Sequence, residues 1–238
     1  MSIWDAGVIR VLKLVNVDAG YGDGLVLRNV SLEVPKGRIT CLVGRNGAGK
    51  TTTMRSIMGL INVSKGDIVL AGNGITGLKT YDRAKAGIGY VPQGREIIPR
   101  LTVEENLMIG LEAKNGKGYI PESIYETFPI LKEFLHRPGG DLSGGQQQQL
   151  AIARAILAEP KVLLLDEPTE GIQPSIIQEI GKIILELKSQ MAILIVEQYL
   201  EFVLGVTDYC YVMENGRITM KGEPENIDME ALQATMSL

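Results

Sequence analysis

The sequence has 238 residues, of which 45% are hydrophobic, and its formal net charge is −4. This length and apolar content suit one α/β domain with a sizeable core, and they exclude an intrinsically disordered chain. The slight acidic excess offers no general basic surface for the phosphate backbone of a nucleic acid, so we expect no nucleic-acid partner.

Cysteine usage and hydropathy indicate the compartment. Cys41 and Cys210 lie far apart in apolar runs, so we expect two buried thiols and neither a disulfide nor a metal site. The segment Met1–Arg10 lacks the basic start and long apolar stretch of a secretory signal. Apolar runs elsewhere are shorter than the roughly 20 residues that span a bilayer. We therefore expect a cytoplasmic protein, which would reach a membrane only through another chain.

In chain order, the opening third is predicted to form strands followed by a helix. Apolar and β-branched runs predict strands at Val11–Val17, Val26–Val34 and Ile39–Val43. The third of these leads into a glycine-rich loop and then into a predicted helix, Lys50–Met58.

The middle of the chain, about Tyr90–Leu142, is predicted to be mainly helical. Thr102 followed by Glu105 resembles a capping box at a helix start, and apolar residues recur after it at helical spacing. Ser143 then precedes a long helical pattern that ends near Pro160. A second region of helices is therefore expected between two regions of strands.

The last third returns to alternating strands and helices. Val162–Leu165 and Ala192–Val196 are predicted as buried strands, with Ser175–Lys188 as the helix between them. A strand, a crossover helix and a second strand imply a parallel sheet that binds ligands at the carboxyl ends of its strands.

The glycine-rich loop matches the phosphate-loop pattern G-x-x-x-x-G-K-[ST] in full. Its glycines let successive backbone N–H groups face one anion, and the following helix adds its positive amino end. Lys50 is expected to neutralise the β- and γ-phosphates, and the Thr51 hydroxyl to ligate Mg²⁺. The predicted nucleotide-binding residues of this loop are Gly44, Arg45, Asn46, Gly47, Ala48, Gly49, Lys50, Thr51 and Thr52.

The strand Val162–Leu165 ends abruptly in two acids, Asp166 and Glu167. We expect this strand to lie beside the phosphate-loop strand, which would deliver both acids to the phosphates. Asp166 is then predicted to hold Mg²⁺, and Glu167 to orient and deprotonate the attacking water. The alternative is a strand that simply exits into solvated acids, and the upstream phosphate loop argues against it.

One further segment indicates a family. Leu142 and the four residues after it, which precede a helix, resemble the signature motif of ABC-transporter ATPases, and the resemblance extends from about Val11 to Gly222. Taken alone, the segment would be a helix start with a serine cap. The resemblance implies a second phosphate-binding surface, because small residues stand at a helix amino end. Its predicted ATP-binding residues are Ser143, Gly144, Gly145 and Gln146.

The resemblance also implies a fold and cofactors. The expected fold is an α/β P-loop NTPase of ABC type, with a mainly parallel core, an antiparallel β subdomain and a helical subdomain at about residues 94–158. All of it would form one ATPase domain, residues 1–238, that hydrolyses ATP with Mg²⁺. In the family, the signature of one subunit closes over the ATP held by the phosphate loop of another, so one chain would contribute to two half-sites.

Two more site residues follow from the resemblance. Tyr21 resembles the aromatic residue that stacks on adenine, although a core tyrosine near a turn is the alternative. Gln93, in the segment Val91–Gln93, resembles the glutamine that contacts Mg²⁺ and the γ-phosphate and couples them to the membrane subunits.

The chain departs from the family pattern at two positions. Gln198 stands where the family usually has a histidine that contacts the γ-phosphate, and Gln173 where an aspartate is common. Gln198 can donate a hydrogen bond, but its amide neither exchanges a proton in catalysis nor carries a charge. We predict that Gln198 has a catalytic role and that the ATP sites of the complex are unequal. Alternatively, Gln198 only satisfies local backbone groups. The single histidine, His136, is predicted to have no catalytic role.

These departures resemble one ATPase subunit of importers for urea and for branched-chain amino acids. The strings Gly139–Gln149 and Thr169–Ile177 favour the urea type. Such importers pair this type of chain with a second, different ATPase and two membrane permeases, and indirectly with a periplasmic solute-binding protein. The chain is then expected at the inner face of the cell membrane.

Two alternatives belong to other functional classes. A soluble ABC ATPase acting on DNA or ribosomes would carry a coiled-coil insertion or a second motif set, and this chain has neither. A phosphotransferase that shares only the phosphate loop would lack the signature segment Leu142–Gln146.

Overall fold

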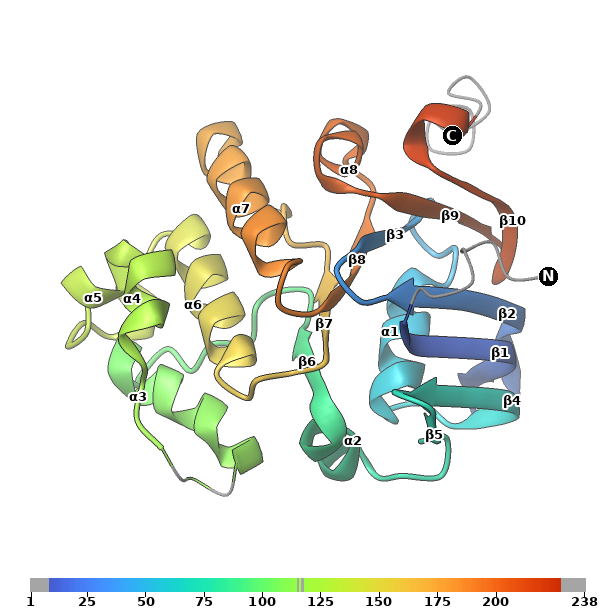
Figure 1. Ribbon diagram of the computed structural model, residues 1–238, viewed down its shortest axis with the longest axis horizontal. Helices are drawn as coiled ribbons and strands as arrows, with labels where there is room; N and C mark the ends of the chain where they lie inside the picture. Colours follow the sequence, from blue (N-terminus) through green and yellow to red (C-terminus); the bar gives the residue numbers. More distant parts are fainter. Residues whose placement is uncertain (1–8, 115, 117, 228–238) are drawn as a thin grey trace.

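Six strands form the central sheet of the computed structural model, which describes residues 9–114, 116 and 118–227 (Figure 1). Their order is β10-β9-β3-β8-β7-β6, and only the β9–β10 pair is antiparallel. The strands are β3 (Ile39–Val43), β6 (Ile88–Val91), β7 (Val162–Asp166), β8 (Ala192–Glu197), β9 (Tyr209–Glu214) and β10 (Arg217–Gly222). Every residue of β3, β7 and β8 is buried, as their uninterrupted apolar runs predict.

The order of these strands corrects one prediction. Strand β7 does not lie beside the phosphate-loop strand β3, because β8 is inserted between them and pairs with both. A buried apolar run shows that a strand is central but not which strand it adjoins. Because β3, β8 and β7 are parallel, their carboxyl ends still share one edge of the sheet, where Asp166 ends β7.

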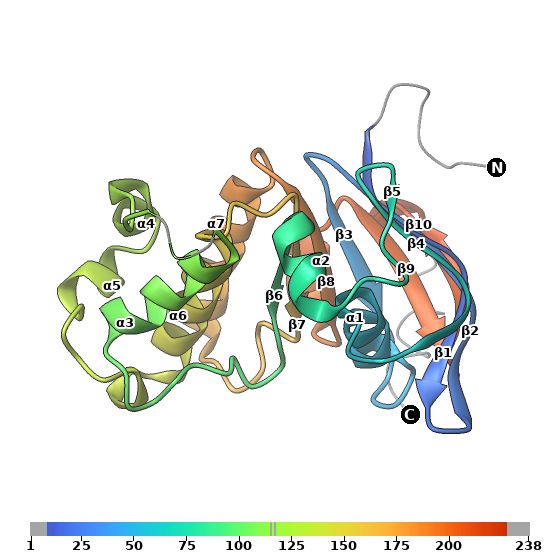
Figure 2. The same cartoon turned by 90° about the horizontal axis from the view of Figure 1, so that it is seen from below.

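A second, antiparallel sheet lies on the other side of α1 (Lys50–Met58) from the helical part of the molecule (Figures 1 and 2). Its order is β2-β1-β4-β5. Alternating buried positions of β1 and β2, such as Leu12, Leu14 and Leu32, pack with Ile57 of α1 in one core cluster. Its strands are β1 (Arg10–Tyr21), β2 (Gly24–Pro35), β4 (Val63–Leu70) and β5 (Asn73–Gly74).

The helical part occupies the opposite end of the molecule (Figures 1 and 2). It contains α3 (Val103–Ile109), α4 (Glu122–Thr127), α5 (Pro129–Glu133), α6 (Gly144–Ile156) and the 3₁₀ turns η1 (Gly110–Lys114) and η2 (Gly139–Asp141). Thr102 forms the expected capping box with Glu105, and Ser143 forms another with Gln146. These helices fall within residues 94–158, whose status as a separate subdomain stays a prediction.

The remaining helices flank strands of the central sheet. Helix α7 (Pro174–Leu187) joins β7 to β8, and α8 (Leu200–Val206) joins β8 to β9. Helix α2 (Thr80–Gly87) precedes β6, and the 3₁₀ turn η3 (Pro224–Asn226) follows β10. The boundaries of α1 match the sequence prediction, whereas β4, β5, β6, β9 and β10 were not predicted. Strand β10 illustrates the reason, since it is half exposed at the sheet edge and its apolar signal is weak.

Cys41 and Cys210 are free and buried, as predicted, and the fold makes them partners in the β3–β9 pairing. Burial raises the pKa of both thiols, that of Cys210 to about 12, so both stay protonated. Among the described residues, no helix combines the length and the apolar character needed to cross a membrane. Residues 1–8 and 228–238, the ends of the expected domain, lie outside the described residues.

Candidate functional site

The predicted phosphate loop connects β3 to α1 at the carboxyl edge of the central sheet. Gly47 and Gly49 have φ angles of 81° and 112°, a left-handed conformation that side chains with a Cβ rarely adopt. A Cβ at Gly44 would lie 2.4 Å from the carbonyl oxygen of Met213, so this glycine permits close contact with the end of β9. The glycines therefore serve both the shape of the loop and its packing.

Lys50 is buried and folds back onto its own loop. Its Nζ donates hydrogen bonds to the carbonyl oxygens of Gly44 at 2.8 Å and Arg45 at 3.1 Å, and it lies 3.6 Å from a carboxylate oxygen of Glu167. These acceptors hold the ammonium charge within the loop that the sequence assigns to phosphates. An incoming phosphate would compete for the same charge.

Asp166 is 1% exposed, and both of its carboxylate oxygens accept hydrogen bonds. The Thr51 hydroxyl donates to Oδ1 at 3.2 Å, and the Tyr90 hydroxyl donates to Oδ2 at 3.3 Å. Burial raises the pKa of Asp166 above its usual range, although these two hydrogen bonds act in the opposite direction. The structure thus brings Asp166 to the start of α1, as the sequence predicts.

Glu167 follows Asp166 in a strained backbone conformation, with φ at 51°. This conformation directs its carboxylate toward Lys50 and toward Gln93, whose Nε2 donates to Oε2 at 3.1 Å. Burial raises the pKa of Glu167, while the nearby charge of Lys50 lowers it. A raised pKa makes a carboxylate a stronger base once it is ionised.

Lys50, Thr51 and Glu167 line a cavity of about 340 Å³ in front of the phosphate loop. The loop contributes one wall, and the other wall comes from Gln93, Glu167, Glu170 and Gln198. Gln198 is exposed, directly after the last residue of β8. The predicted base and the glutamine that replaces histidine therefore face the same space.

The residues predicted to hold Mg²⁺ fit that ion. Thr51 and Asp166 present two oxygen atoms 3.2 Å apart, and both residues, with Gln93, line a cavity of about 430 Å³ beside α1. No group of three or more His, Cys, Asp or Glu side chains suited to a metal occurs among the described residues. This sparse donor set suits Mg²⁺ with a nucleotide, because phosphates and water provide most of its ligands.

Tyr21 lines the same cavity at the far end of β1, and 50% of its surface is exposed. It is therefore not the core tyrosine that was the alternative. The Arg55 guanidinium, one turn after Thr51 on α1, hydrogen-bonds to the Tyr21 hydroxyl. An exposed ring held beside the phosphate loop is available for stacking on a flat base.

The signature segment lies at the amino end of α6, and its glycines are closely packed. A Cβ at Gly145 would lie 2.4 Å from the side chain of Ile176 on α7, and one at Gly144 would lie 3.3 Å from the Gly171 carbonyl oxygen. None of the described residues lining the cavity at the phosphate loop comes from Ser143–Gln146. Within one chain, the structure does not bring these two predicted phosphate-binding elements together.

The two remaining sequence positions have simple surroundings. Gln173 is the residue before the first turn of α7 and is exposed. The His136 side chain is 88% exposed, and its Nδ1 lies 3.8 Å from a carboxylate oxygen of Glu104. Both side chains lie on the surface, and the absence of a catalytic role for His136 stays a prediction.

Sequence reasoning missed three residues of the site: Tyr90, Arg55 and Glu170. Tyr90 stands three residues before Gln93, and Arg55 one helical turn after Thr51, so a helix and strand assignment places both near the predicted site. Neither position alone identifies its partner, because Tyr90 bonds to a residue 76 positions away. Glu170 gave no sequence signal beyond its nearness to Glu167.

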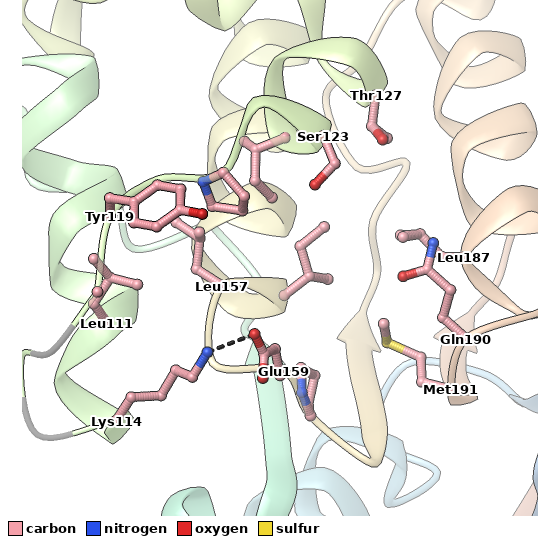
Figure 3. A pocket seen from close by; sticks show the side chains of 15 residues that line it. Leu111, Lys114, Tyr119, Ser123, Thr127, Leu157, Glu159, Leu187, Gln190 and Met191 are labelled. Carbon is pink, nitrogen blue, oxygen red and sulfur yellow. Dashed lines mark ion pairs between the residues drawn. The ribbon is translucent and has the colours of Figure 1, made fainter.

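A separate cavity of about 510 Å³ lies between the helical part and the central sheet (Figure 3). It is lined by the segments that precede β7 and β8, including Leu157 and Met191, and by the ion pair between Lys114 and Glu159. These segments meet the amino ends of the strands, so this cavity lies at the opposite edge of the sheet from the phosphate loop. It contains none of the predicted site residues.

Known proteins resemble this chain both in sequence and in architecture. BraG of Pseudomonas aeruginosa, a high-affinity branched-chain amino acid transport ATP-binding protein, is 41% identical over 88% of this chain and 91% of its own. LivF of Archaeoglobus fulgidus, a probable branched-chain amino acid transport ATP-binding protein, is 38% identical over 89% and 92%. A crystal structure of an ATP-binding cassette of an ABC transporter in its ADP conformation has 31% sequence identity and a TM-score of 0.81, covering 96% of this chain and 95% of that one.

A family model described as ABC transporter matches residues 27–170, more than half of the chain. The matched range contains the phosphate loop, the signature segment and both acids at the end of β7. The expected fold is confirmed, with its mainly parallel core, antiparallel sheet and helical part. The chain therefore belongs to the ABC transporter family and is one of its ATP-hydrolysing chains.

Proposed function

We propose that this chain powers an importer of branched-chain amino acids by binding and hydrolysing ATP. The observation that carries the ATPase role is the convergence of Lys50 and Glu167 at the cavity in front of the phosphate loop, where Thr51 also hydrogen-bonds to Asp166. The solute is supported by the relatives BraG and LivF, each of which matches about nine-tenths of the chain. Their support outweighs the sequence preference for urea.

The proposed chemistry assigns one role to each group of the site. Backbone N–H groups of Gly44–Thr52 bind the phosphates, and Lys50 leaves its carbonyl acceptors to neutralise the β- and γ-phosphates. Thr51, Asp166 and Gln93 would hold Mg²⁺, which when bound neutralises phosphate charge. Exposed Tyr21 provides the stacking surface for adenine.

Glu167 is the proposed base for the attacking water. Its carboxylate is anchored by Gln93 and lies near Lys50, so a water between it and the γ-phosphate would be oriented by a fixed acceptor. Gln198, which lines the same cavity, would donate a hydrogen bond to the γ-phosphate. Gln93 contacts the base in this structure, so movement of the Gln93 loop and alignment of the base are linked.

The ATP site is proposed to be completed by a second ATPase subunit, a different chain. Ser143, Gly144, Gly145 and Gln146 do not line the cavity at the phosphate loop of their own chain, whereas Ser143 at the exposed amino end of α6 faces solvent. They would contact the nucleotide held by that second chain. Two membrane permeases and, indirectly, a periplasmic solute-binding protein complete the proposed assembly at the inner face of the membrane.

The solute is tested with the complex that this chain forms with its co-expressed permeases and binding protein. We expect leucine, isoleucine or valine with the binding protein to stimulate ATP hydrolysis in proteoliposomes, and urea to have no effect. Stimulation by urea alone would instead support the second candidate, which rests on the strings Gly139–Gln149 and Thr169–Ile177. Recovery of the chain with ribosomes or DNA, without permeases, would contradict the transporter role.

Glu167→Gln in the same complex tests the ATPase mechanism. The substitution keeps the size and one acceptor oxygen but removes the proton acceptor, so we expect turnover to fall by about 100-fold or more. Binding of ATP should stay within about threefold of the wild type, because no phosphate ligand is lost. Unchanged hydrolysis would refute Glu167 as the base.

A further inference from the structure

Glu197, the last residue of β8, places a carboxylate between two loops of the ATP site. It is 1% exposed, and each of its oxygens serves a different loop. Oε1 accepts hydrogen bonds from the backbone N–H and the hydroxyl of Thr169, at 3.0 and 2.7 Å. Oε2 accepts from the backbone N–H groups of Gln198 and Tyr199, at 2.9 and 3.2 Å.

The buried carboxylate of Glu197 needs hydrogen-bond donors around it. A buried carboxylate is strongly unfavourable unless hydrogen bonds replace its hydration. The four bonds to Glu197 meet that need, and within residues 9–114, 116 and 118–227 no lysine or arginine forms an ion pair with it. All four donors belong to two loops, so the carboxylate is satisfied only while both loops hold their positions.

Both loops carry residues that line the cavity at the phosphate loop. Thr169 stands two residues after Glu167, the proposed base, and Gln198 directly follows Glu197. A backbone bond from the Glu167 N–H to the Val196 carbonyl oxygen, at 2.9 Å, ties the same two segments together one residue earlier. Glu197 thus extends the pairing of β7 and β8 beyond the ends of the strands and into the site.

We propose that Glu197 is a positioning residue for ATP hydrolysis, which sets Gln198 and the loop after Glu167 in one fixed arrangement. The inference rests on the proposed roles of Glu167 and Gln198. It assigns Glu197 to the hydrolysis step and not to nucleotide binding, because none of its four donors belongs to the phosphate loop. The departure at Gln198 gives this role added weight, since a neutral side chain depends more on correct placement than on charge.

The principal test is Glu197→Gln in the assembled complex. Glutamine has nearly the same shape but only one acceptor oxygen, so its amide NH₂ would face the N–H donors of one loop. We expect kcat to fall by about 10- to 100-fold, the scale of a small misplacement of reacting groups, while KM for ATP changes by less than about twofold. Thr169→Val, which removes one of the four donors, should lower kcat by a smaller factor.

Asp208→Asn is the matched control for a general loss of stability. Asp208 is also a well-shielded carboxylate that accepts a backbone N–H, from Ile39 at 2.8 Å, but it lies at the amino end of β3, away from the phosphates. We expect this variant to lower the melting temperature and to leave kcat unchanged. Glu197→Gln should lower kcat even at temperatures where both variants are fully folded.

A double-mutant cycle with Gln198→Ala decides whether Glu197 acts through its neighbour. If it does, the two losses in kcat should combine to less than their product, because removing Gln198 removes most of what Glu197 positions. Multiplicative losses, or a kcat for Glu197→Gln equal to that of the wild type, would overturn the proposal. If Glu197→Gln does not fold, Thr169→Val in the same cycle provides the answer. Glu167→Gln, measured alongside, separates failure of this inference from failure of the assigned base.

Discussion

At the scale of single residues, the buried charged groups of the proposed ATP site find polar partners within the chain itself. Lys50 bonds to two carbonyl oxygens of its own loop and lies near Glu167, and Asp166 accepts from Thr51 and Tyr90. Each contact protects a buried charge that phosphates and Mg²⁺ are expected to meet later. Substitutions at these positions therefore affect stability and nucleotide binding differently.

Lys50→Ala should weaken ATP binding by about 10- to 100-fold, the value of a charge-assisted contact to phosphate. Titration with a fluorescent ATP analogue measures the affinity directly. Lys36→Ala provides the control, because Lys36 is exposed in the turn before β3 and has no role in the site. Normal ATP affinity in the Lys50 variant would contradict the phosphate-loop assignment.

Asp166→Asn should raise the melting temperature of the nucleotide-free protein at neutral pH. Burial raises the pKa of Asp166 in the folded state above its unfolded value of about 3.9. Its contribution to stability is therefore fully present below the unfolded pKa and is lost as the pH rises through the folded pKa. Asparagine does not ionise, so its advantage over the wild type should be greatest at pH 7 and should vanish near pH 4.

Melting curves between pH 4 and 8 test this expectation, with nucleotide and Mg²⁺ left out. An advantage of the Asp166→Asn variant that did not change with pH would show that titration of this carboxyl is not its cause. The same variant should lose Mg²⁺-dependent ATP hydrolysis. The native aspartate at position 166 would then support function while lowering the stability of the nucleotide-free protein.

At the scale of elements, two contacts connect the helical part to the loops of the ATP site. Three consecutive residues after Gln93 have positive φ angles, and the Arg95 guanidinium in this strained run donates to the Glu170 carbonyl oxygen at 2.8 Å. The Arg154 side chain of α6 donates to the carbonyl oxygen of Glu96 in the same run, also at 2.8 Å. Movement of α6 would thus be transmitted to the Gln93 loop and to the loop after Glu167.

Gly145→Ala should disturb the packing of α6 against α7. The added Cβ would lie 2.4 Å from Ile176 Cγ2, so we expect a loss of about 1–3 kcal/mol in the free energy of unfolding, as for other overpacked positions. Gly144→Ala is the matched control, because its Cβ would meet nothing closer than 3.3 Å and alanine favours the helix. Urea denaturation compares the two variants, and equal losses would show that packing on α7 is not the reason for glycine at position 145.

At the scale of the whole molecule, one chain presents its phosphate loop and its signature segment, the two proposed halves of an ATP site, on separate surfaces. The phosphate loop and its cavity lie at the carboxyl edge of the central sheet, and the signature segment begins α6 in the helical part (Figure 1). Two subunits that close over ATP and separate after hydrolysis would convert differential affinity for nucleotide into movement of the permeases. The proposed functional unit is therefore a pair of ATPase subunits and not the single chain.

The complex with a second, different ATPase should have unequal sites. Gln198 lines the cavity at this chain's phosphate loop, and its proposed hydrogen bond to the γ-phosphate would be neutral where a histidine could carry charge. We expect hydrolysis at this site to be about tenfold slower than at the partner site, the usual difference between a neutral and a charge-assisted hydrogen bond. Single-turnover hydrolysis with one site disabled at a time provides the comparison.

A second variant strengthens this test. Gln198→His should speed hydrolysis at this chain's site and make it fall as the pH rises above about 6.5, where histidine loses its charge. Equal rates at the two sites of the unmodified complex would contradict unequal sites and would favour the alternative that Gln198 only satisfies local backbone groups.

The sequence by itself determined the local chemistry of this protein. The phosphate loop with α1, the buried strand that ends in Asp166 and Glu167, and the capping boxes all depend on neighbouring residues, and each forms where its pattern indicates. Because parallel strands have their carboxyl ends at the same edge of a sheet, the sequence also placed the predicted residues at one edge, whatever the order of the strands. The phosphate loop and both acids therefore needed no structure to be found.

Only the tertiary structure decided which distant groups meet. It inserted β8 between β3 and β7, joined Tyr90 to Asp166 and Gln93 to Glu167, and placed Glu197 between two loops. The Tyr90–Asp166 and Gln93–Glu167 contacts span 76 and 74 positions of sequence, and they depend on how whole elements pack. Local propensity fixes the conformation of a segment, whereas its neighbours are chosen by the burial of entire faces, which no short stretch of sequence encodes.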